Sequence, residues 1–231
     1  MKLNGKRALI AGASGLIGRE LLNILLQSDT YDQVYAMVRR PLETKHPKLT
    51  EIVYSFDQLE QVAEQLAVDD VFCCLGTTIK KAKSKEAMYQ VDVHYPTSLA
   101  KLSKEQGARH FLVVSSMNAN MKSPFWYARM KGMLEEQLQH VSFEALSIFR
   151  PSLLLGERHE SRLLEDLSSK VIRSLFSLLG RPIPSRLAIE AKVVAQAMFH
   201  VANEKRVGVT IYSSNQIEAI ASSTSITFRN N

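Results

Sequence analysis

Short apolar runs alternate along the chain with longer segments in which apolar residues recur every three or four positions. The short runs predict strands and the periodic segments predict amphipathic helices. The predicted strands are 7–11, 33–38, 51–54, 70–75, 110–115 and 143–149, and the predicted helices are 16–27, 58–67, 84–106 and 125–140. Asp57 is the predicted N-cap of the second helix. Regular alternation of this kind specifies parallel strands with right-handed crossovers, so we expect an α/β protein with a doubly wound parallel sheet of the Rossmann type.

The pattern changes after about residue 155. The later segments are a charged stretch leading into an apolar helix that ends near Leu179, a helix over 187–203, a strand over 207–212 and an amphipathic stretch over 215–221. We expect a single domain over 1–221, in which 155–221 form a small C-terminal, substrate-side region near the carboxyl ends of the strands, where ligands bind in this fold. Residues 222–231 lack periodicity and are predicted to be a flexible tail.

The first predicted strand runs into a glycine-rich turn and then into a helix. Gly12 would permit the tight turn, Gly15 would let the backbone approach a pyrophosphate, and Gly18 would let the helix pack close to the sheet. The anion would then bind the N–H groups of the helix N-terminus. The predicted cofactor contacts here are Gly12, Ser14, Gly15, Leu16, Ile17 and Gly18. The alternative is a glycine-rich connection that binds nothing.

Two arginines follow the second predicted strand, where a carboxylate would bind the ribose 2′-hydroxyl of NAD in this fold. The guanidinium groups of Arg39 and Arg40 match a 2′-phosphate instead, which favours NADP(H) over NAD(H). A solvated strand end is the alternative. Leu75, Gly76 and Thr77 follow the fourth strand and are expected beside the adenosine and ribose, unless they form only a strand-ending turn.

Candidate catalytic groups lie on the next strand and helix. Tyr127 and Lys131 are four residues apart on a predicted helix and therefore share one face. An adjacent ammonium favours the phenolate form of a tyrosine, which suits it to proton transfer. Ser115 and Ser116 end the preceding strand, and one of the two hydroxyls could orient a substrate oxygen. A solvent-facing tyrosine and lysine are the alternative.

Composition narrows the partners and the compartment. The net charge of +6 and the lysine-rich residues 80–85 invite a nucleic-acid interpretation, but no aromatic residue is interleaved there, so we expect a solvated loop and no nucleic-acid partner. Cys73 and Cys74 are neighbours on a strand, point to opposite faces and are expected to be reduced. No signal peptide and no apolar run of roughly 20 residues is present, so a cytoplasmic protein is expected, with no membrane partner and no metal site.

Four motifs together resemble the short-chain dehydrogenase/reductase superfamily: GASGLIG, FLVVSS, YARMK and FRPSLLLG. More narrowly, VFCCLGTT, HFLVVSS and SIFRPSLLLGERHESR resemble the Tat-interacting-protein group of atypical members, across roughly residues 6–205. The resemblance implies a Rossmann fold, NADPH at the glycine turn and the arginine pair, and a Ser/Tyr/Lys site with Pro151 and Leu153 near the nicotinamide. Two positions depart from the usual pattern. Met117 stands where many extended members have the catalytic Ser or Thr, and Asp92 is the nearest equivalent of an active-site asparagine.

These features predict an NADPH-dependent oxidoreductase of the short-chain dehydrogenase type, which transfers hydride to a small carbonyl substrate. The alternative is an NADPH-binding regulatory or redox-sensing protein with little or no turnover. A sugar-nucleotide epimerase is disfavoured, because the region after residue 150 is short for a large substrate domain. A protein partner or a homodimer is left open.

Overall fold

The computed structural model describes residues 5–155 and 187–224, so the predicted helix ending near Leu179 lies outside the described residues. The strands are β1 (Lys6–Ala11), β2 (Tyr31–Val38), β3 (Leu49–Val53), β4 (Asp70–Cys73), β5 (His110–Val114), β6 (Ala145–Arg150), β7 (Leu153–Leu155), β8 (Ala188–Glu190) and β9 (Gly208–Ser213). The helical segments are α1 (Leu16–Gln27), η1 (Phe56–Leu66), α2 (Ile79–Ala82), α3 (Lys85–Tyr89), η2 (Gln90–His94), α4 (Tyr95–Glu105), α5 (Trp126–Val141), α7 (Ala191–Ala202) and α8 (Ser214–Thr224).

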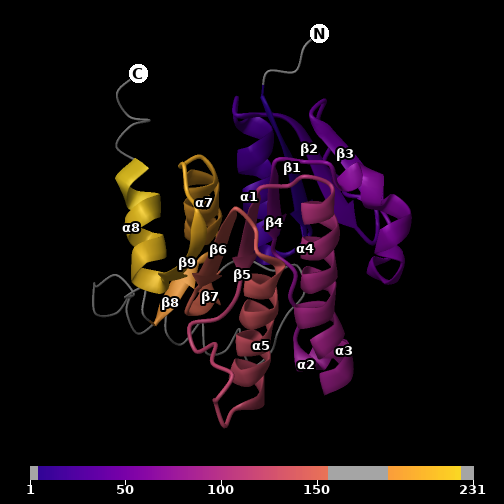
Figure 1. Cartoon of the computed structure of the whole chain (residues 1–231). Helices are drawn as coiled ribbons and strands as arrows, with labels where there is room; N and C mark the ends of the chain where they lie inside the picture. The colour runs from indigo at the N-terminus through magenta and orange to yellow at the C-terminus, as the bar shows by residue number, and fades with distance from the viewer. Residues whose placement is uncertain (1–4, 156–186, 225–231) are drawn as a thin grey trace.

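The main sheet has seven strands in the order β3-β2-β1-β4-β5-β6-β9, and every neighbouring pair is parallel. The order runs outward from β1 in one direction and from β4 in the other, so the topological switch point lies between β1 and β4. In open parallel sheets, ligands bind beyond the carboxyl ends of the strands at that point. Figure 1 shows the sheet with helices on both sides, which confirms the predicted doubly wound α/β fold.

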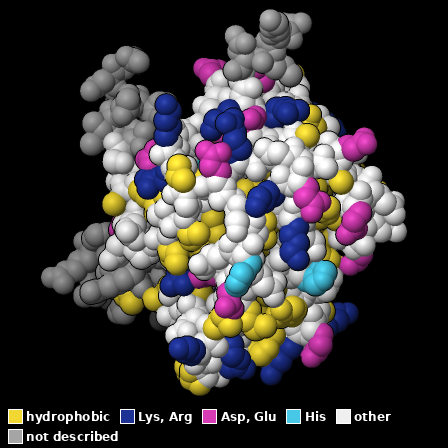
Figure 2. Space-filling model, viewed as in Figure 1, with side chains coloured by type: hydrophobic (Ala, Val, Ile, Leu, Met, Phe, Trp, Pro, Cys, Tyr) yellow, Lys and Arg dark blue, Asp and Glu magenta, His cyan; other side chains and the backbone are white. Residues whose placement is uncertain are grey.

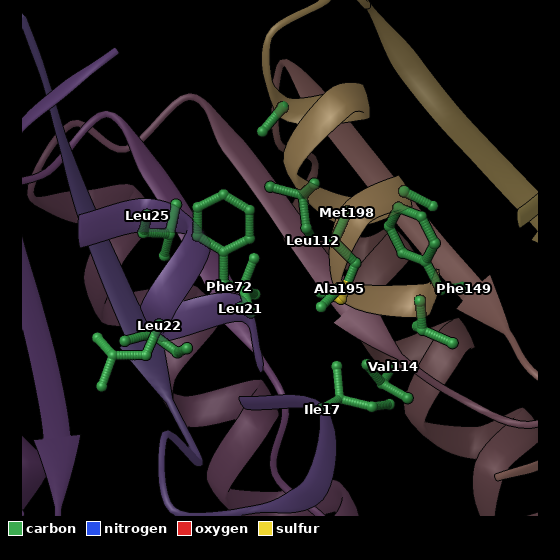
Figure 3. Close-up of a cluster of buried hydrophobic side chains, with 14 of the residues drawn as sticks. Ile17, Leu21, Leu22, Leu25, Phe72, Leu112, Val114, Phe149, Ala195 and Met198 are labelled. Carbon is green, nitrogen blue, oxygen red and sulfur yellow. The ribbon is translucent and has the colours of Figure 1, made fainter. Parts of the chain in front are cut away.

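Both faces of the sheet are buried, as the apolar runs of the sequence require. Ala8 and Ile10 of β1 belong to the core under α1, α7 and α8, whereas Leu9 and Ala11 belong to the core under η1, α4 and α5. Figure 3 shows side chains of the first core from α1, α7 and the central strands, with Leu21, Phe72 and Met198 among those that are labelled. Two helical layers therefore hold the sheet rigidly between them.

The prediction that Asp57 is the N-cap of the second helix is wrong. The 3₁₀ helix η1 begins at Phe56, and its N-cap is Ser55, whose hydroxyl accepts the Asp57 N–H. Serine and aspartate cap helices equally well, so composition could not choose between two such residues two positions apart. The Asp57 carboxylate instead accepts a hydrogen bond from the Tyr95 hydroxyl at 2.7 Å.

The segment predicted as one helix over 84–106 is helical throughout but not uniform. A π-helical turn, η2, connects α3 to α4. A π turn inserts an extra residue into the helix and re-aims its side chains, and such turns are frequent at functional sites. Asp92 lies within this turn and is buried.

The C-terminal elements complete the sheet and one of its helical layers. The segment predicted as a helix over 187–203 begins as β8, which pairs with β7, before α7 starts at Ala191. Strand β9 extends the sheet beside β6, and α7 packs between α1 and α8 (Figure 1). Helix α8 continues to Thr224, beyond the predicted start of the tail at residue 222. Strand β7 begins soon after β6 ends and pairs with β8, so this short pair lies beyond the carboxyl end of β6.

Two further expectations concern the compartment. Cys73 is buried on β4, Cys74 follows it half-buried, and both are free thiols. Burial raises the pKa of the Cys73 thiol to about 12, so it is inert at neutral pH. Across residues 5–155 and 187–224, no helix combines the length and the apolar character needed to cross a membrane.

Candidate functional site

The glycine turn after β1 has the conformation that the sequence predicts. Gly12 has φ +87°, and a Cβ there would lie 2.6 Å from the Cys74 carbonyl oxygen. Gly18 differs in one detail: a Cβ would lie 2.1 Å from the Gly12 oxygen, so this glycine packs α1 against the turn rather than against the sheet. Neighbouring backbone therefore packs tightly against this turn at Gly12 and at Gly18.

The open side of this turn is the N-terminus of α1. Gly15 is the N-cap, no side chain caps the helix, and no acidic residue lies in its first turn. These conditions suit a bound anion, because the helix dipole and the N–H groups are not compensated by a carboxylate. Ser14 is exposed, Leu16 is half-buried and the Ile17 side chain belongs to the core (Figure 3), so Ile17 can offer a ligand only its backbone. The cradle fits a dinucleotide diphosphate.

The remaining cofactor candidates lie at neighbouring strand ends. Arg39 and Arg40 directly follow β2 and are exposed. The Cys74 N–H donates to the Ala11 carbonyl at 2.8 Å, which places the loop after β4 beside the glycine turn. In that loop Gly76 is exposed, Leu75 and Thr77 are half-buried, and the Thr77 N–H donates to a carboxylate oxygen of Asp92 at 2.8 Å. The glycine turn, the arginine pair and the loop after β4 thus all lie at the carboxyl ends of neighbouring strands.

A pocket of about 960 Å³ opens at the ends of β5 and β6. Five of the predicted site residues line it: Ser115, Ser116, Tyr127, Pro151 and Leu153. Its outer wall is the loop between β5 and α5, which carries the exposed side chains of Met117, Met121 and Phe125. Figure 2 shows hydrophobic and basic side chains interspersed at the lower end of the molecule, where this loop and the start of α5 lie in Figure 1. The pocket is large enough for a small organic ligand.

The backbone fixes the wall of this pocket. The Asn120 N–H donates to the Ala128 carbonyl at 3.0 Å, and the Met117 N–H donates to the Pro151 carbonyl at 3.1 Å. A Cβ at Gly132 would lie 2.4 Å from the Met121 nitrogen. Only glycine at position 132 therefore allows the loop to lie against α5 as it does.

Tyr127 and Lys131 share a face of α5, but their environments differ. Tyr127 is 43% exposed and lines the pocket, whereas Lys131 is 3% exposed. The Lys131 ammonium lies 2.8 Å from Oδ1 of Asp92. Burial alone would lower the pKa of Lys131, but the attraction of the Asp92 carboxylate outweighs burial and the pKa is raised. The lysine therefore carries its charge at neutral pH beneath the exposed phenol.

The structure separates the two candidate serines. The Ser115 hydroxyl donates to Oε1 of Glu135 at 2.5 Å, and the same carboxylate accepts the Arg150 Nε–H at 2.9 Å. Ser115 is thus part of a buried network that joins β5, α5 and β6. Ser116 is half-buried at the pocket and remains the better placed to meet a ligand.

The sequence alone did not indicate a role for Glu135, and it indicated no partner for Asp92. Both are charged residues on the buried stripe of an amphipathic helix: Asp92 lies beside Val93 and four residues after the buried Met88, and Glu135 lies beside the buried Leu134. A charge on an apolar stripe is a signal that can be read from sequence, because such a group is buried only when it is paired. Its partner cannot be read, because the partner lies on another element.

Comparison with known proteins identifies relatives of this chain. A family model described as NAD(P)H-binding matches residues 12–153. Protein HTATIP2 of Rattus norvegicus is 37% identical over 203 residues, covering 86% of this chain and 82% of that protein. Protein FMP52, mitochondrial, of Eremothecium gossypii is 33% identical over 183 residues, covering 76% of this chain and 82% of that protein.

Solved structures share the fold at lower identity. MoeE5 in complex with UDP-glucuronic acid and NAD has a TM-score of 0.70 at 19% identity, covering 96% of this chain and 82% of that one. A short chain dehydrogenase family protein from Francisella tularensis has a TM-score of 0.63 at 14% identity, covering 92% of this chain and 98% of that one. The fold, the cradle at the switch point and these relatives together place the chain in the NAD(P)H-binding family, within the HTATIP2-like group.

Proposed function

We propose that this protein is an NADPH-dependent reductase of a small carbonyl compound. The observation that carries the proposal is the shared pocket: Ser116 and Tyr127 line it together with Pro151 and Leu153, and Lys131 lies one helical turn beyond Tyr127 on the same face of α5. A hydroxyl donor, a phenol and a buried cation at one pocket are the groups that carbonyl reduction requires.

The residues have separate roles in this proposal. A bound reduced nicotinamide supplies the hydride to the carbonyl carbon. Tyr127 gives its phenolic proton to the carbonyl oxygen, and Ser116 donates a hydrogen bond that orients the same oxygen. The Lys131 ammonium stabilises the phenolate that remains, because an opposite charge nearby favours the ionised form. Tyr127 is half-exposed and regains its proton from water. Carbonyl, hydride and proton thus give the alcohol.

A panel test decides whether the pocket reduces carbonyls. NADPH oxidation is measured with aldehydes and ketones of increasing size, with UDP-glucose as an additional ligand because some structural neighbours were solved with UDP-sugars. Turnover that is lost in Tyr127→Phe supports the proposal. Tight NADPH binding without turnover on any member of the panel rejects it.

We also propose NADP(H) as the preferred cofactor. Arg39 and Arg40 are exposed at the end of β2, where the 2′-substituent of the adenosine ribose is bound in this fold. Arg39→Ala should weaken NADPH binding about tenfold and leave NADH binding unchanged, because only NADPH carries the 2′-phosphate. Calorimetry measures both, with Arg7→Ala at the amino end of β1 as a charge-matched control. Equal losses for the two cofactors in Arg39→Ala would remove the argument.

A specific observation favours the alternative of a cofactor-binding regulatory protein with little turnover. The Asp92 carboxylate neutralises much of the charge that Lys131 would otherwise exert on Tyr127. A weakly supported phenolate would leave NADPH binding intact and chemistry slow. A partner that binds only the NADPH-loaded protein, together with an inactive carbonyl panel, would support this function.

We propose a reducing compartment, with the cytoplasm as the expected one. Two adjacent thiols that stay free support this choice. The name of the FMP52 relative makes the mitochondrion the alternative. Cell fractionation with an antibody against the chain distinguishes the two.

A further inference from the structure

Asp92 and Lys131 form a deeply buried ion pair at the site, and only Lys131 takes part in the proposed reaction. Asp92 is 1% exposed and its partner Lys131 is 3% exposed. Burying two charges costs free energy unless their mutual attraction and further hydrogen bonds compensate, so such a pair is weak evidence for stability alone. Lys131 has a role in the proposed reaction. Asp92 as yet has none.

Asp92 connects two parts of the site that are distant in sequence. Its Oδ1 faces the Lys131 ammonium at 2.8 Å, while its Oδ2 accepts the Thr77 N–H at 2.8 Å. A Cβ at Gly76 would lie in ordinary contact with Oδ1, at 3.6 Å, so the loop after β4 lies directly over the carboxylate. One side chain thus holds the cofactor-side loop and the lysine of α5 together.

The helix that carries Asp92 is adapted to place it there. Asp92 lies in the π turn η2, whose flanking helices α3 and α4 are regular, and α4 packs alongside α5 (Figure 1). A single π turn in an otherwise regular helix re-aims the residues within it. Here it accompanies a carboxylate that reaches both Thr77 and Lys131.

We propose that Asp92 is a positioning residue, which holds the loop after β4 and the Lys131 ammonium as one preformed cofactor surface. This inference rests on the proposed function for the role of Lys131. Among the residues that the structure describes, Asp92 provides the ammonium's one ion pair, so the other N–H groups of the ammonium can serve a bound ribose. The groups that act on the Lys131 charge are Asp92 from η2, Tyr127 from α5 and Cys73 from β4, and the Cys73 thiol is neutral at working pH.

The pH dependence of NADPH binding tests this inference without any need for turnover. The chain has a single tryptophan, Trp126, next to Tyr127, so energy transfer from it to NADPH reports binding. In Asp92→Asn the ammonium loses its counter-ion, the effect of burial on its pKa is opposed less strongly, and Lys131 deprotonates at lower pH. We expect wild type and variant to bind NADPH alike at pH 6.5, and the variant to bind about tenfold more weakly at pH 9.

A matched control is available at the other end of the sheet. Asp70 is also buried and also pairs with a lysine, Lys6, at 3.0 Å. Asp70→Asn should therefore lower stability without changing the pH profile of NADPH binding. If Asp92→Asn folds poorly, the double variant Asp92→Asn/Lys131→Met removes both charges, and its NADPH affinity should be weak and independent of pH up to pH 9.

The outcomes are separable from those of the proposed function. An Asp92→Asn profile that superimposes on wild type, or a double variant that binds NADPH as tightly as wild type at every pH, overturns the role of Asp92 even if the wild type reduces carbonyls. A wild type that binds NADPH but turns nothing over rejects the reductase, while a shifted Asp92→Asn profile would still establish Asp92 as the residue that holds Lys131.

Discussion

Each end of the sheet has a set of one aspartate, one lysine and one tyrosine, and the hydrogen bonds and ion pairs within the two sets differ. At the amino end, Asp70 pairs with Lys6 at 3.0 Å and accepts the Tyr31 hydroxyl at 2.7 Å. Burial, reinforced by the Asp70 charge, raises the pKa of Tyr31 far above its ordinary value. Burial also raises the pKa of Asp70, although its two partners oppose the change. The phenol at this end is a fully buried structural donor.

At the carboxyl end the tyrosine is connected differently. Asp92 binds Lys131 and a backbone N–H, and Tyr127 stands one helical turn from the lysine, half-exposed at a pocket. The comparison teaches that the partner of the carboxylate decides the environment of the phenol: where the carboxylate binds the lysine and a backbone N–H, the phenol is left open to water at a pocket. When the carboxylate accepts the phenol itself, the set only stabilises the fold.

The sharpest way to break this comparison is to remove each phenolic hydroxyl in turn. Tyr127→Phe should reduce carbonyl turnover a hundredfold or more with NADPH affinity within a few-fold of wild type, because a general acid contributes about that much. Tyr31→Phe should leave turnover intact and cost about 1–3 kcal/mol of unfolding free energy, because Asp70 loses a buried donor. Steady-state kinetics and urea unfolding measure the two. The same kinetic loss in both variants would erase the distinction between the two ends.

The amino end of the sheet also contains a buried histidine whose protonation depends on pH. His110, near Lys6, is buried and hydrogen-bonded to Ser147 at 2.9 Å; burial, together with the positive charges of Lys6 and Arg206, lowers its pKa to about 4. Between pH 6.5 and 4, His110 is therefore protonated in the unfolded chain but neutral in the folded chain. The His110 contribution to stability is present above pH 6.5 and is lost as the pH falls toward 4, by roughly 1.4 kcal/mol per pH unit.

His110→Gln isolates this effect, because glutamine keeps a polar partner for Ser147 but does not titrate. Urea unfolding across this pH range should give a steeper loss of stability in wild type than in His110→Gln. NADPH affinity at pH 7 should be the same in both. Parallel stability curves would show that another group controls the acid response.

The smallest expected effect distinguishes the two serines. Ser116→Ala should lower turnover about tenfold, because it removes one hydrogen bond to the reacting oxygen, and should leave stability unchanged. Ser115→Ala should cost about 1 kcal/mol of stability, because Glu135 loses a buried donor. Its turnover should stay near that of wild type. A larger kinetic loss in Ser115→Ala would exchange the roles of the two residues.

The sequence predicts what is local and misses what depends on contacts between elements. The helix over 16–27, the doubly wound parallel sheet and the glycine turn follow from periodicity and from backbone freedom at Gly12. The Asp92–Lys131 pair joins residues 39 positions apart on different helices, and no local pattern encodes such a contact. The π turn is missed for a similar reason: its flanking residues have ordinary helical periodicity, and the extra residue shows only in three dimensions.

The contact between Gly132 and the pocket loop bears on how this site could be redesigned. Because the loop backbone lies against α5 with no room for even a methyl group between them, the loop cannot move closer to α5 to accommodate a larger ligand. A larger pocket would require smaller side chains on the loop. Phe125, which is three-quarters exposed, is the first residue to replace with a smaller one. A library that varies those side chains and leaves Gly132 untouched would retune selectivity while keeping the scaffold intact.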